Sequence, residues 1–347
     1  MENQIAVTER QKTVLAAVVN AYIKTGCPIG SKAVAREFRF EISSATVRNE
    51  MSELEENGFI THPHISAGRV PTDKGYRYYV DSLMQVSSVE PNEAAWVAWE
   101  FRQKAGSVED LIDRTIQILA ALTEQAAWIV YPGWEMLVLK HIELIPFRQR
   151  RLVVVWTATS GFVQNKVVEL PVDVSENELS RLNYFLNGEL SGKYFSEIPK
   201  YLNSRLAEAN DAVLSLYRAA RLVAERVFGG LDERRFVLHG ARHIFRQPEF
   251  RDQNKTRLLA RLLERTNTLR ELFMEPVSSG QVRVKIGREN HPEETWDFST
   301  VMAPYHFQDQ SLGTLGILGP TRMPYARVIA LVDCVARRLT NGIEALV

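Results

Sequence analysis

An α+β fold with more than one domain is predicted by three features of the sequence. Three helical patterns and a short hairpin pattern fill roughly the first 80 residues. From about residue 107 onward, strand and helix patterns are mixed without strict alternation, which is typical of α+β proteins. The length of 347 residues corresponds to two or three domains, and 24% charged and 45% hydrophobic residues are ordinary values for a globular chain.

The first two helices are predicted from capping residues and apolar spacing. Thr8 and Gln11 form a capping box, and Gly26 ends the helix that they begin. Ser31 can cap a second helix, and a short turn at residues 39–42 leads to a third. The apolar stripes of the first two helices are Val14, Leu15, Val18, Tyr22 and Ile23, and then Ala33, Val34, Ala35 and Phe38. The second and third helices, joined by this short turn, indicate a helix-turn-helix, in which the later of the two helices is the one that contacts DNA bases.

The third helix carries the most informative pattern. Ser43 or Ser44 can accept hydrogen bonds from its first free N–H groups, and Gly58 is well placed to end it. Its core stripe consists of Val47, Met51 and Leu54. Helical periodicity therefore leaves a second, polar face on the opposite side.

That polar face has residue types that read DNA bases. Arginine pairs with guanine, asparagine pairs with adenine, and alanine contacts the thymine methyl group. Glu53, Glu55 and Glu56 follow, and DNA phosphates would repel these carboxylates. We therefore expect the N-terminal half of the helix to enter the groove and the C-terminal half to point away. The candidate DNA-binding residues of this helix are Ser44, Ala45, Thr46, Arg48, Asn49 and Ser52.

A hairpin with basic residues is predicted directly after this helix. A strand starts at residues 59–61, Gly68 permits an unusual backbone angle at the hairpin tip, and Val70 begins the return strand. Three helices followed by such a hairpin indicate an N-terminal winged helix-turn-helix. Arg69 at the tip is expected to contact phosphate or the minor groove, while the other two basic residues are weaker backbone contacts. The candidate DNA contacts of the wing are Arg69, Lys74 and Arg77.

Aromatic residues alternate with these basic residues. On a strand, Tyr76 and Tyr78 would share one face and pack as core under the wing. Arg77 would then point the other way, toward solvent or a phosphate.

A protein-binding module is the alternative interpretation of the same helix and hairpin pattern. Residues 1–82 contain ten Lys and Arg and ten Asp and Glu, so the predicted DNA-binding domain is not basic overall. Only the wing is locally basic. The pattern of reading residues, and not the charge, favours DNA.

Further elements are predicted beyond a polar, proline-containing linker at residues 86–92. Ser107 caps one helix, Ser175 with Glu178 caps another, and Gly161 lies at a turn between strands. Strands are predicted at 137–145, 152–157, 162–170, 236–239, 282–286, 295–301 and 312–318, and helices at 200–228, 256–273 and 325–340.

The sequence lacks the motifs of common enzymes, so no catalytic residue, cofactor or metal is expected. It has no phosphate-binding glycine loop, no Gly-x-Ser-x-Gly elbow and no His-Glu-x-x-His motif. His62 and His64 could share a strand face and hold a metal, but polar wing residues near phosphate are the favoured interpretation. A basic stretch is interpreted as a solvated or interface surface and contains Arg234, Arg235, Arg242, Arg246 and Arg251.

Cysteine usage indicates a cytosolic protein, and net charge bears on its affinity for nucleic acid. The formal net charge is zero, which predicts modest nonspecific affinity for nucleic acid. Cys27 and Cys334 lie far apart in unlike contexts and are interpreted as lone thiols. We expect no signal peptide, and no run of ~20 apolar residues is present to span a membrane.

Several of these segments together resemble one bacterial family. The matching motifs lie at residues 8–35, 43–60, 66–83, 286–290 and 312–325, and the resemblance spans nearly the whole chain. In these motifs the chain is similar to the HrcA family of heat-inducible transcription repressors.

The resemblance implies a domain organisation. After the winged helix-turn-helix, it implies a GAF-like domain with an inserted module that mediates dimerisation. We place the domain borders at 1–85 for the winged helix-turn-helix, 86–105 for a linker, 106–171 and 241–347 for the two parts of the GAF-like domain, and 172–240 for the insert.

The resemblance also implies a function and partners. A homodimer would bind double-stranded DNA at the CIRCE inverted repeat, repress the chaperone operons groE and dnaK, and depend on the GroEL chaperonin for activity. Heat stress would relieve repression, and the protein would lie in the bacterial cytoplasm and at the nucleoid when bound. The alternative is a GAF-type transcriptional regulator that senses a small ligand.

Overall fold

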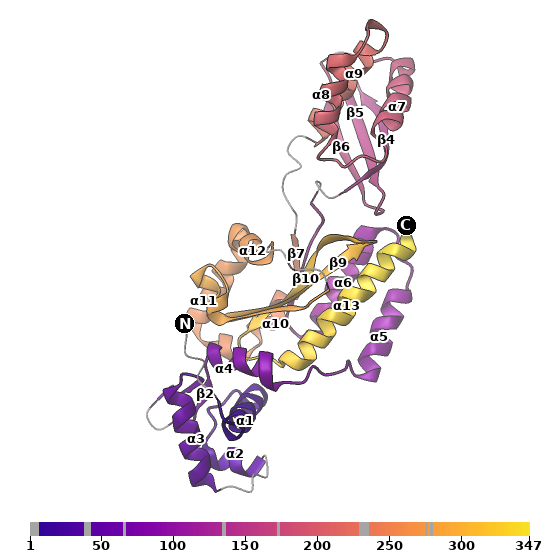
Figure 1. The fold of residues 1–347 in the computed structure, drawn as a ribbon. Coiled ribbons are helices and arrows are strands. Elements are labelled where there is room, and N and C mark those ends of the chain that lie inside the picture. The colour runs from indigo at the N-terminus through magenta and orange to yellow at the C-terminus, as the bar shows by residue number, and fades with distance from the viewer. Residues whose placement is uncertain are drawn as a thin grey trace.

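The computed structural model describes residues 7–37, 43–64, 67–133, 137–171, 174–228, 236–274, 277 and 280–347. Figure 1 shows three parts: a winged helical part at one end, a central part built on a five-stranded sheet, and a three-stranded unit at the other end. Helices and strands are mixed throughout, so the α+β prediction is confirmed. No helix in the described ranges is both long enough and apolar enough to cross a membrane.

The winged part has the predicted order of elements. Its elements are α1 (Glu9–Thr25), α2 (Ser31–Glu37), α3 (Ser44–Glu56), β1 (Ile60–Thr61), β2 (Val70–Pro71), α4 (Asp73–Tyr78) and a short π-helix, η1 (Tyr79–Leu83). Thr8 and Gln11 form the predicted capping box, and Gly26 caps the end of α1. The predicted turn at residues 39–42, together with Phe38, lies outside the described residues.

The segment after the wing differs from its prediction, because α4 is a helix and not a strand. Thr72 accepts a hydrogen bond from the backbone N–H of Gly75 (3.1 Å) and so caps α4. Helical spacing then buries Tyr76 and Tyr79, while Tyr78 packs edge-on against Phe59. The expected alternation of Tyr76 with Tyr78 is therefore wrong, although Tyr76 does belong to the core.

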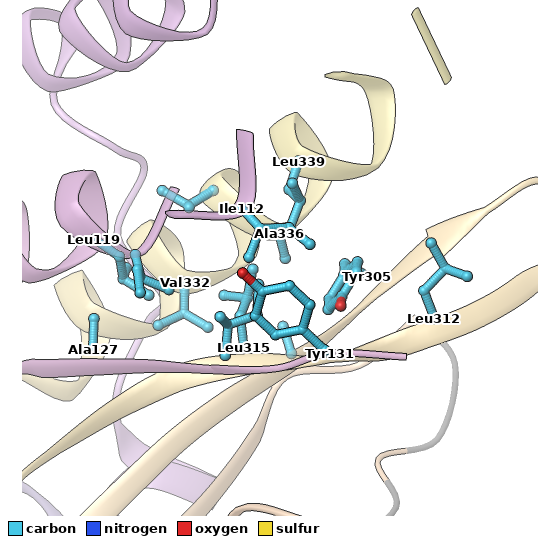
Figure 2. Close-up of a cluster of buried hydrophobic side chains, with 14 of the residues drawn as sticks. Ile112, Leu119, Ala127, Tyr131, Tyr305, Leu312, Leu315, Val332, Ala336 and Leu339 are labelled. Atoms are coloured by element: carbon cyan, nitrogen blue, oxygen red, sulfur yellow. The ribbon is translucent and has the colours of Figure 1, made fainter. Parts of the chain in front are cut away.

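The central sheet has the strand order β7-β3-β10-β9-β8, and every neighbouring pair is antiparallel. Its strands are β3 (Ala126–Val130), β7 (Phe236–His239), β8 (Arg283–Ile286), β9 (Phe298–Phe307) and β10 (Gln310–Pro320). On one face, side chains from α6 (Val108–Thr123) and α13 (Tyr325–Leu346) pack with Tyr305, Leu315 and their neighbours, as Figure 2 shows. This face of the sheet is therefore a hydrophobic core that the C-terminal helix completes.

Aromatic side chains fill the other face of the central sheet. Trp128 stacks on Phe273 with ring centroids 4.2 Å apart, and Phe250 stacks on Phe298 at 5.3 Å. The elements on this side are α10 (Ala241–Phe245), η3 (Pro248–Arg251), α11 (Gln253–Glu264) and α12 (Thr266–Phe273). This face is a second hydrophobic core.

The three-stranded unit interrupts the chain between β3 and β7. Its elements are β4 (Leu139–Arg148), β5 (Arg151–Ala158), β6 (Val163–Glu169), α7 (Glu176–Leu190), α8 (Ile198–Glu208) and α9 (Asp211–Phe228). Because β4, β5 and β6 form a sheet of their own, this unit starts before residue 172, where we placed the border of the insert. The GAF-like character of the central part stays a prediction.

Some predicted elements have different bounds. The predicted linker contains a helix, α5 (Pro91–Arg102), and the predicted helix at 200–228 is interrupted between α8 and α9. Strand β3 was not predicted, because its five buried residues show no alternation of apolar and polar positions.

Candidate DNA-binding site

The reading helix α3 begins as predicted. The Ser43 side chain accepts a hydrogen bond from the backbone N–H of Thr46 (3.2 Å), which satisfies one of the free donors at the helix start. Its buried side chains are Val47, Met51 and Leu54. Ala45, Arg48 and Asn49 are exposed on the other side, and Ser44, Thr46 and Ser52 are half-buried. The six predicted reading residues therefore share the solvent side of one helix.

Arg48 and Asn49, the two residues best suited to contact DNA bases, have side chains without a protein partner among the described residues. Within the part of the chain that the structure describes, the side chains of Arg48 and Asn49 form no ion pair and no hydrogen bond. Ser52, by contrast, donates to the backbone carbonyl of Arg48 (3.1 Å). Exposed and unpaired donors at the N-terminal half of a helix are available to base edges.

Three glutamates of α3 contact other elements of the winged part, whereas Glu56 is exposed. Glu50 lies 3.3 Å from Arg10, and Glu53 accepts a hydrogen bond from the Gln11 side chain (2.6 Å), so both contact α1. Glu55 contacts the wing instead. Glu50, Glu53 and Glu55 therefore contact their own domain, and the entry of the N-terminal half of α3 into the groove stays a prediction.

The wing is fastened to the turn that precedes α2. Ile29 and Arg69 exchange two backbone hydrogen bonds, each 2.8 Å long. A side chain at Gly68 would place its Cβ only 2.5 Å from the Ile29 carbonyl carbon, so this approach requires glycine. An open hollow of about 340 Å³ lies beside this bridge, between α2, α3 and the wing, and its lining includes Lys32, Arg48 and Arg69. Three cationic side chains therefore surround one concave surface.

Arg69 is already paired within the protein. Its guanidinium lies 2.6 Å from Glu55, which also pairs with His62. Partial burial would raise the pKa of Glu55, but the hydrogen bond from His62 and the charge of Arg69 outweigh it, so this pKa lies below its ordinary value. Glu55 is thus ionised at neutral pH and restrains the wing arginine.

The other two predicted wing contacts also have protein partners. The Lys74 ammonium donates to the Asn57 carbonyl (2.9 Å) and lies 4.6 Å from the centre of the Phe59 ring. Arg77 does not point to solvent as expected, since its guanidinium binds residues of the central part. A DNA contact by either residue would have to compete with these bonds and stays a prediction.

Lys32 was not predicted as a DNA contact. It is exposed, follows the first residue of α2 and lines the hollow beside Arg48. A basic residue in the first turn of the helix before the reading helix is a signal that could have identified it. The imidazole of His62 is bound to Glu55, and within the described ranges no three His, Cys, Asp or Glu residues lie together as metal ligands would.

Comparison with known families identifies two regions of the chain. A family described as "Winged helix-turn-helix transcription repressor, HrcA DNA-binding" matches residues 6–82. A second family, described as "HrcA protein C terminal domain", matches residues 109–329. Together the two matches cover the winged part and most of the remaining chain.

Curated relatives match over nearly full length. The heat-inducible transcription repressor HrcA of Desulforamulus reducens is 33% identical over 341 residues, which are 97% of each chain. The repressor of the same name from Moorella thermoacetica is 34% identical over 340 residues, 97% of this chain and 98% of the relative. That of Halalkalibacterium halodurans is 33% identical over 334 residues, 96% of this chain and 97% of the relative.

A solved structure has the same fold. It is a crystal structure at 2.2 Å resolution, described as that of a hypothetical protein, with a TM-score of 0.67 and 23% sequence identity. The similarity covers 99% of this chain and 100% of the other.

Proposed function

The chain belongs to the HrcA family of heat-inducible transcription repressors, and we propose that it acts as a dimer on an inverted-repeat operator. Family membership makes it a DNA-binding regulator with a winged helix and not an enzyme. We propose that its targets are the chaperone operons groE and dnaK, that its operator is the CIRCE inverted repeat, and that heat stress relieves repression. It would act in the bacterial cytoplasm, at the nucleoid when bound.

One observation carries the proposed mode of DNA binding. Arg48 and Asn49 are exposed and unpaired on the N-terminal half of α3, beside a hollow that is lined by further cations. In the proposed complex this half of α3 lies in the major groove, where Arg48 and Asn49 contact base edges and Ala45 contacts a thymine methyl group. Ser44, Thr46 and Ser52 lie beside them and contact bases or phosphates.

The wing supplies the proposed backbone contacts. Arg69 exchanges its bond with Glu55 for a phosphate or reaches the minor groove, and Lys32 binds a phosphate on the other side of the hollow. Lys74 contributes less, because its ammonium already binds a carbonyl of the protein. Arg77 is assigned no DNA contact in this proposal, because its guanidinium is bound to Glu289 and to the Val284 carbonyl.

The three-stranded unit is the proposed dimerisation module. Its sheet is buried on one side, where Trp156 packs edge-on against Phe228 of α9. On the other side the strand register aligns Ile145, Val153 and Val167 in one row, and Ile145 and Val167 are 44% and 54% exposed. An exposed apolar sheet face of this kind fits a partner surface, and a two-fold dimer presents the same face from both copies.

Dimerisation would match the symmetry of the operator. Two copies related by a two-fold axis place two α3 helices in successive major grooves, about 34 Å or a whole number of turns apart. Since residues 1–82 carry equal numbers of acidic and basic residues, one copy should bind DNA weakly. A change in the fraction of dimer would therefore change the extent of repression.

The proposed heat response works through the chaperonin. If the GroEL chaperonin maintains the folded, DNA-binding dimer, then unfolded proteins that occupy the chaperonin during heat stress deplete the active repressor. Chaperone genes would be transcribed until free chaperonin is restored.

A gel-shift experiment tests this function. The purified protein is titrated onto the chaperone promoters of its own organism, with and without GroEL, and onto a promoter lacking the inverted repeat. We expect binding only where the repeat is present, and a larger active fraction with chaperonin. Binding that requires a small molecule and ignores the chaperonin would instead establish the alternative, a ligand-sensing regulator.

A further inference from the structure

Three groups of polar contacts among the described residues attach the winged part to the central part. Figure 1 shows α4 between the two parts, on the side of the winged part that faces the central sheet. After η1, residues 84–90 run to α5 without helix or strand, so the covalent connection alone does not fix the orientation of the winged part. The non-covalent attachments decide that orientation.

The first attachment is made by Arg77. Its guanidinium binds both carboxylate oxygens of Glu289, with an Nε–Oε1 distance of 2.7 Å, and donates to the backbone carbonyl of Val284 (2.7 Å). Asp81, one turn along, accepts a further bond (3.0 Å). Glu289 also accepts from the backbone N–H of Ile286 (2.9 Å), so both partners are held firmly in their own parts. A two-pronged arginine–carboxylate pair fixes distance and angle together.

The second attachment is made by Asp73 at the start of α4. Its carboxylate accepts a hydrogen bond from the backbone N–H of Arg288 (2.9 Å). Gly287 has φ +51°, and a Cβ there would lie 2.2 Å from Asp73 Oδ2. Only glycine permits both this backbone angle and this approach.

The third attachment involves the end of α1. Arg322 donates to the Ile23 carbonyl in the last turn of α1 (2.6 Å) and pairs with Glu249 of η3. The Arg322 side chain is only 12% exposed, and a cation is favourable at the C-terminal end of a helix. Nearby, the buried rings of Tyr76 and Tyr325 lie 5.8 Å apart.

We propose that Asp73, Arg77, Glu289 and Arg322 are positioning residues that set the orientation of the reading helix relative to the central part. None of them contacts DNA in this role. The inference rests on the proposed dimeric function, because in a dimer these bonds set the distance and rotation between the two copies of α3. The protein would then select the spacing of two half-sites as well as their sequence.

The physical reason is the difference between a fixed and a mobile pair of binding modules. When both reading helices are held in one geometry, binding of the first half-site presents the second helix at high effective concentration. If the attachments open, that advantage falls, but a wider range of half-site spacings can be bound. Affinity for one half-site is independent of the attachments.

The test compares Arg77→Ala and Glu289→Gln with wild type, and uses Arg257→Ala, which removes an exposed arginine of α11, as the charge control. Gel shifts use three duplexes: the inverted repeat from the chaperone promoter, one half-site, and the repeat with two added central base pairs. The added pairs rotate one half-site by about 70°.

We expect wild type and Arg257→Ala to bind the altered spacing on the order of tenfold more weakly than the natural repeat. Arg77→Ala and Glu289→Gln should bind the natural repeat several-fold more weakly, lose most of the spacing preference, and bind the half-site as wild type does. The Arg77→Ala/Glu289→Gln double variant should be no weaker than Arg77→Ala alone, because Glu289 has already lost its partner in the single variant.

Three results would overturn the inference. If Arg77→Ala loses as much affinity for the half-site as for the natural repeat, Arg77 is a DNA contact. If the variants bind all three duplexes as wild type does, the attachments have no role in DNA binding. If the variants bind the natural repeat more tightly than wild type does, the attachments are inhibitory. A thermal melting scan of each variant reports folding independently of DNA binding, and Glu289→Gln serves if Arg77→Ala does not fold. A wild type that binds the full repeat no better than the half-site would instead refute the dimeric function itself.

Discussion

The winged part has two faces that use the same residue type in opposite ways. On the reading face, Arg48 is exposed and has no partner among the described residues. On the attached face, Arg77 binds Glu289, Val284 and Asp81. The comparison shows that residue type alone does not identify a DNA contact, since the outcome depends on whether the protein itself satisfies the donors.

Energetics explain why the two faces can coexist. A guanidinium in water is well solvated, so the exposed Arg48 side chain lowers the stability of the free protein little when it has no partner. A half-buried guanidinium needs acceptors, and removal of one partner leaves the other charge partly desolvated. The reading face is thus ready for an external ligand, whereas the attached face is complete.

Removal of Arg48 should have the largest effect on DNA binding. Arg48→Ala is expected to weaken specific binding by ~1–3 kcal/mol and to relax the preference for one base, because a two-pronged pair with guanine is lost. Gel shifts on the operator and on single-base variants measure both quantities. If Arg48→Ala changes neither the affinity nor the base preference, the proposed placement of the N-terminal half of α3 in the major groove is wrong.

Arg69→Ala should have a smaller and less selective effect. If Arg69 contacts phosphate, affinity for every sequence falls together, and the slope of log affinity against log salt flattens by about one. Affinity measured from low to high salt on operator and unrelated DNA tests this expectation. An unaltered slope would remove Arg69 from the phosphate contacts.

Glu55→Gln should have an effect of opposite sign. Loss of this carboxylate releases Arg69 and His62, so affinity for all sequences should rise by a factor of about two to five. Glu56→Gln is the matched control, since Glu56 is an exposed neighbour on the same helix. Equal gains from both variants would mean that general charge, and not release of Arg69, is responsible.

Lys74→Ala should have the smallest effect on DNA binding. Its ammonium already binds the Asn57 carbonyl and lies over Phe59, so we expect less than about a twofold loss of affinity. A modest decrease in melting temperature should accompany it, which a calorimetric scan would measure. A loss as large as that of Arg69→Ala would place Lys74 on the DNA-binding face.

Local rules predicted much of the winged part correctly. The cap at Ser43, the capping box of Thr8 with Gln11 and the buried stripe of α3 depend on residues within one or two turns of each other. The strand-like alternation expected for Tyr76 and Tyr78 is wrong, because α4 is a helix. Alternating aromatic residues suggested a strand, but the Thr72 cap and packing of α4 against Phe59 favour a helix.

Sequence by itself determined which side of α3 is polar, where that helix starts and ends, and which family the chain resembles. Only the tertiary structure decided that Arg77 faces Glu289, 212 positions away, that Glu55 restrains Arg69, and that Lys32 joins the reading face. Helix caps and periodicity are short-range properties that neighbouring residues encode. The partners of a long, charged side chain are set by the packing of distant elements, which no local pattern records.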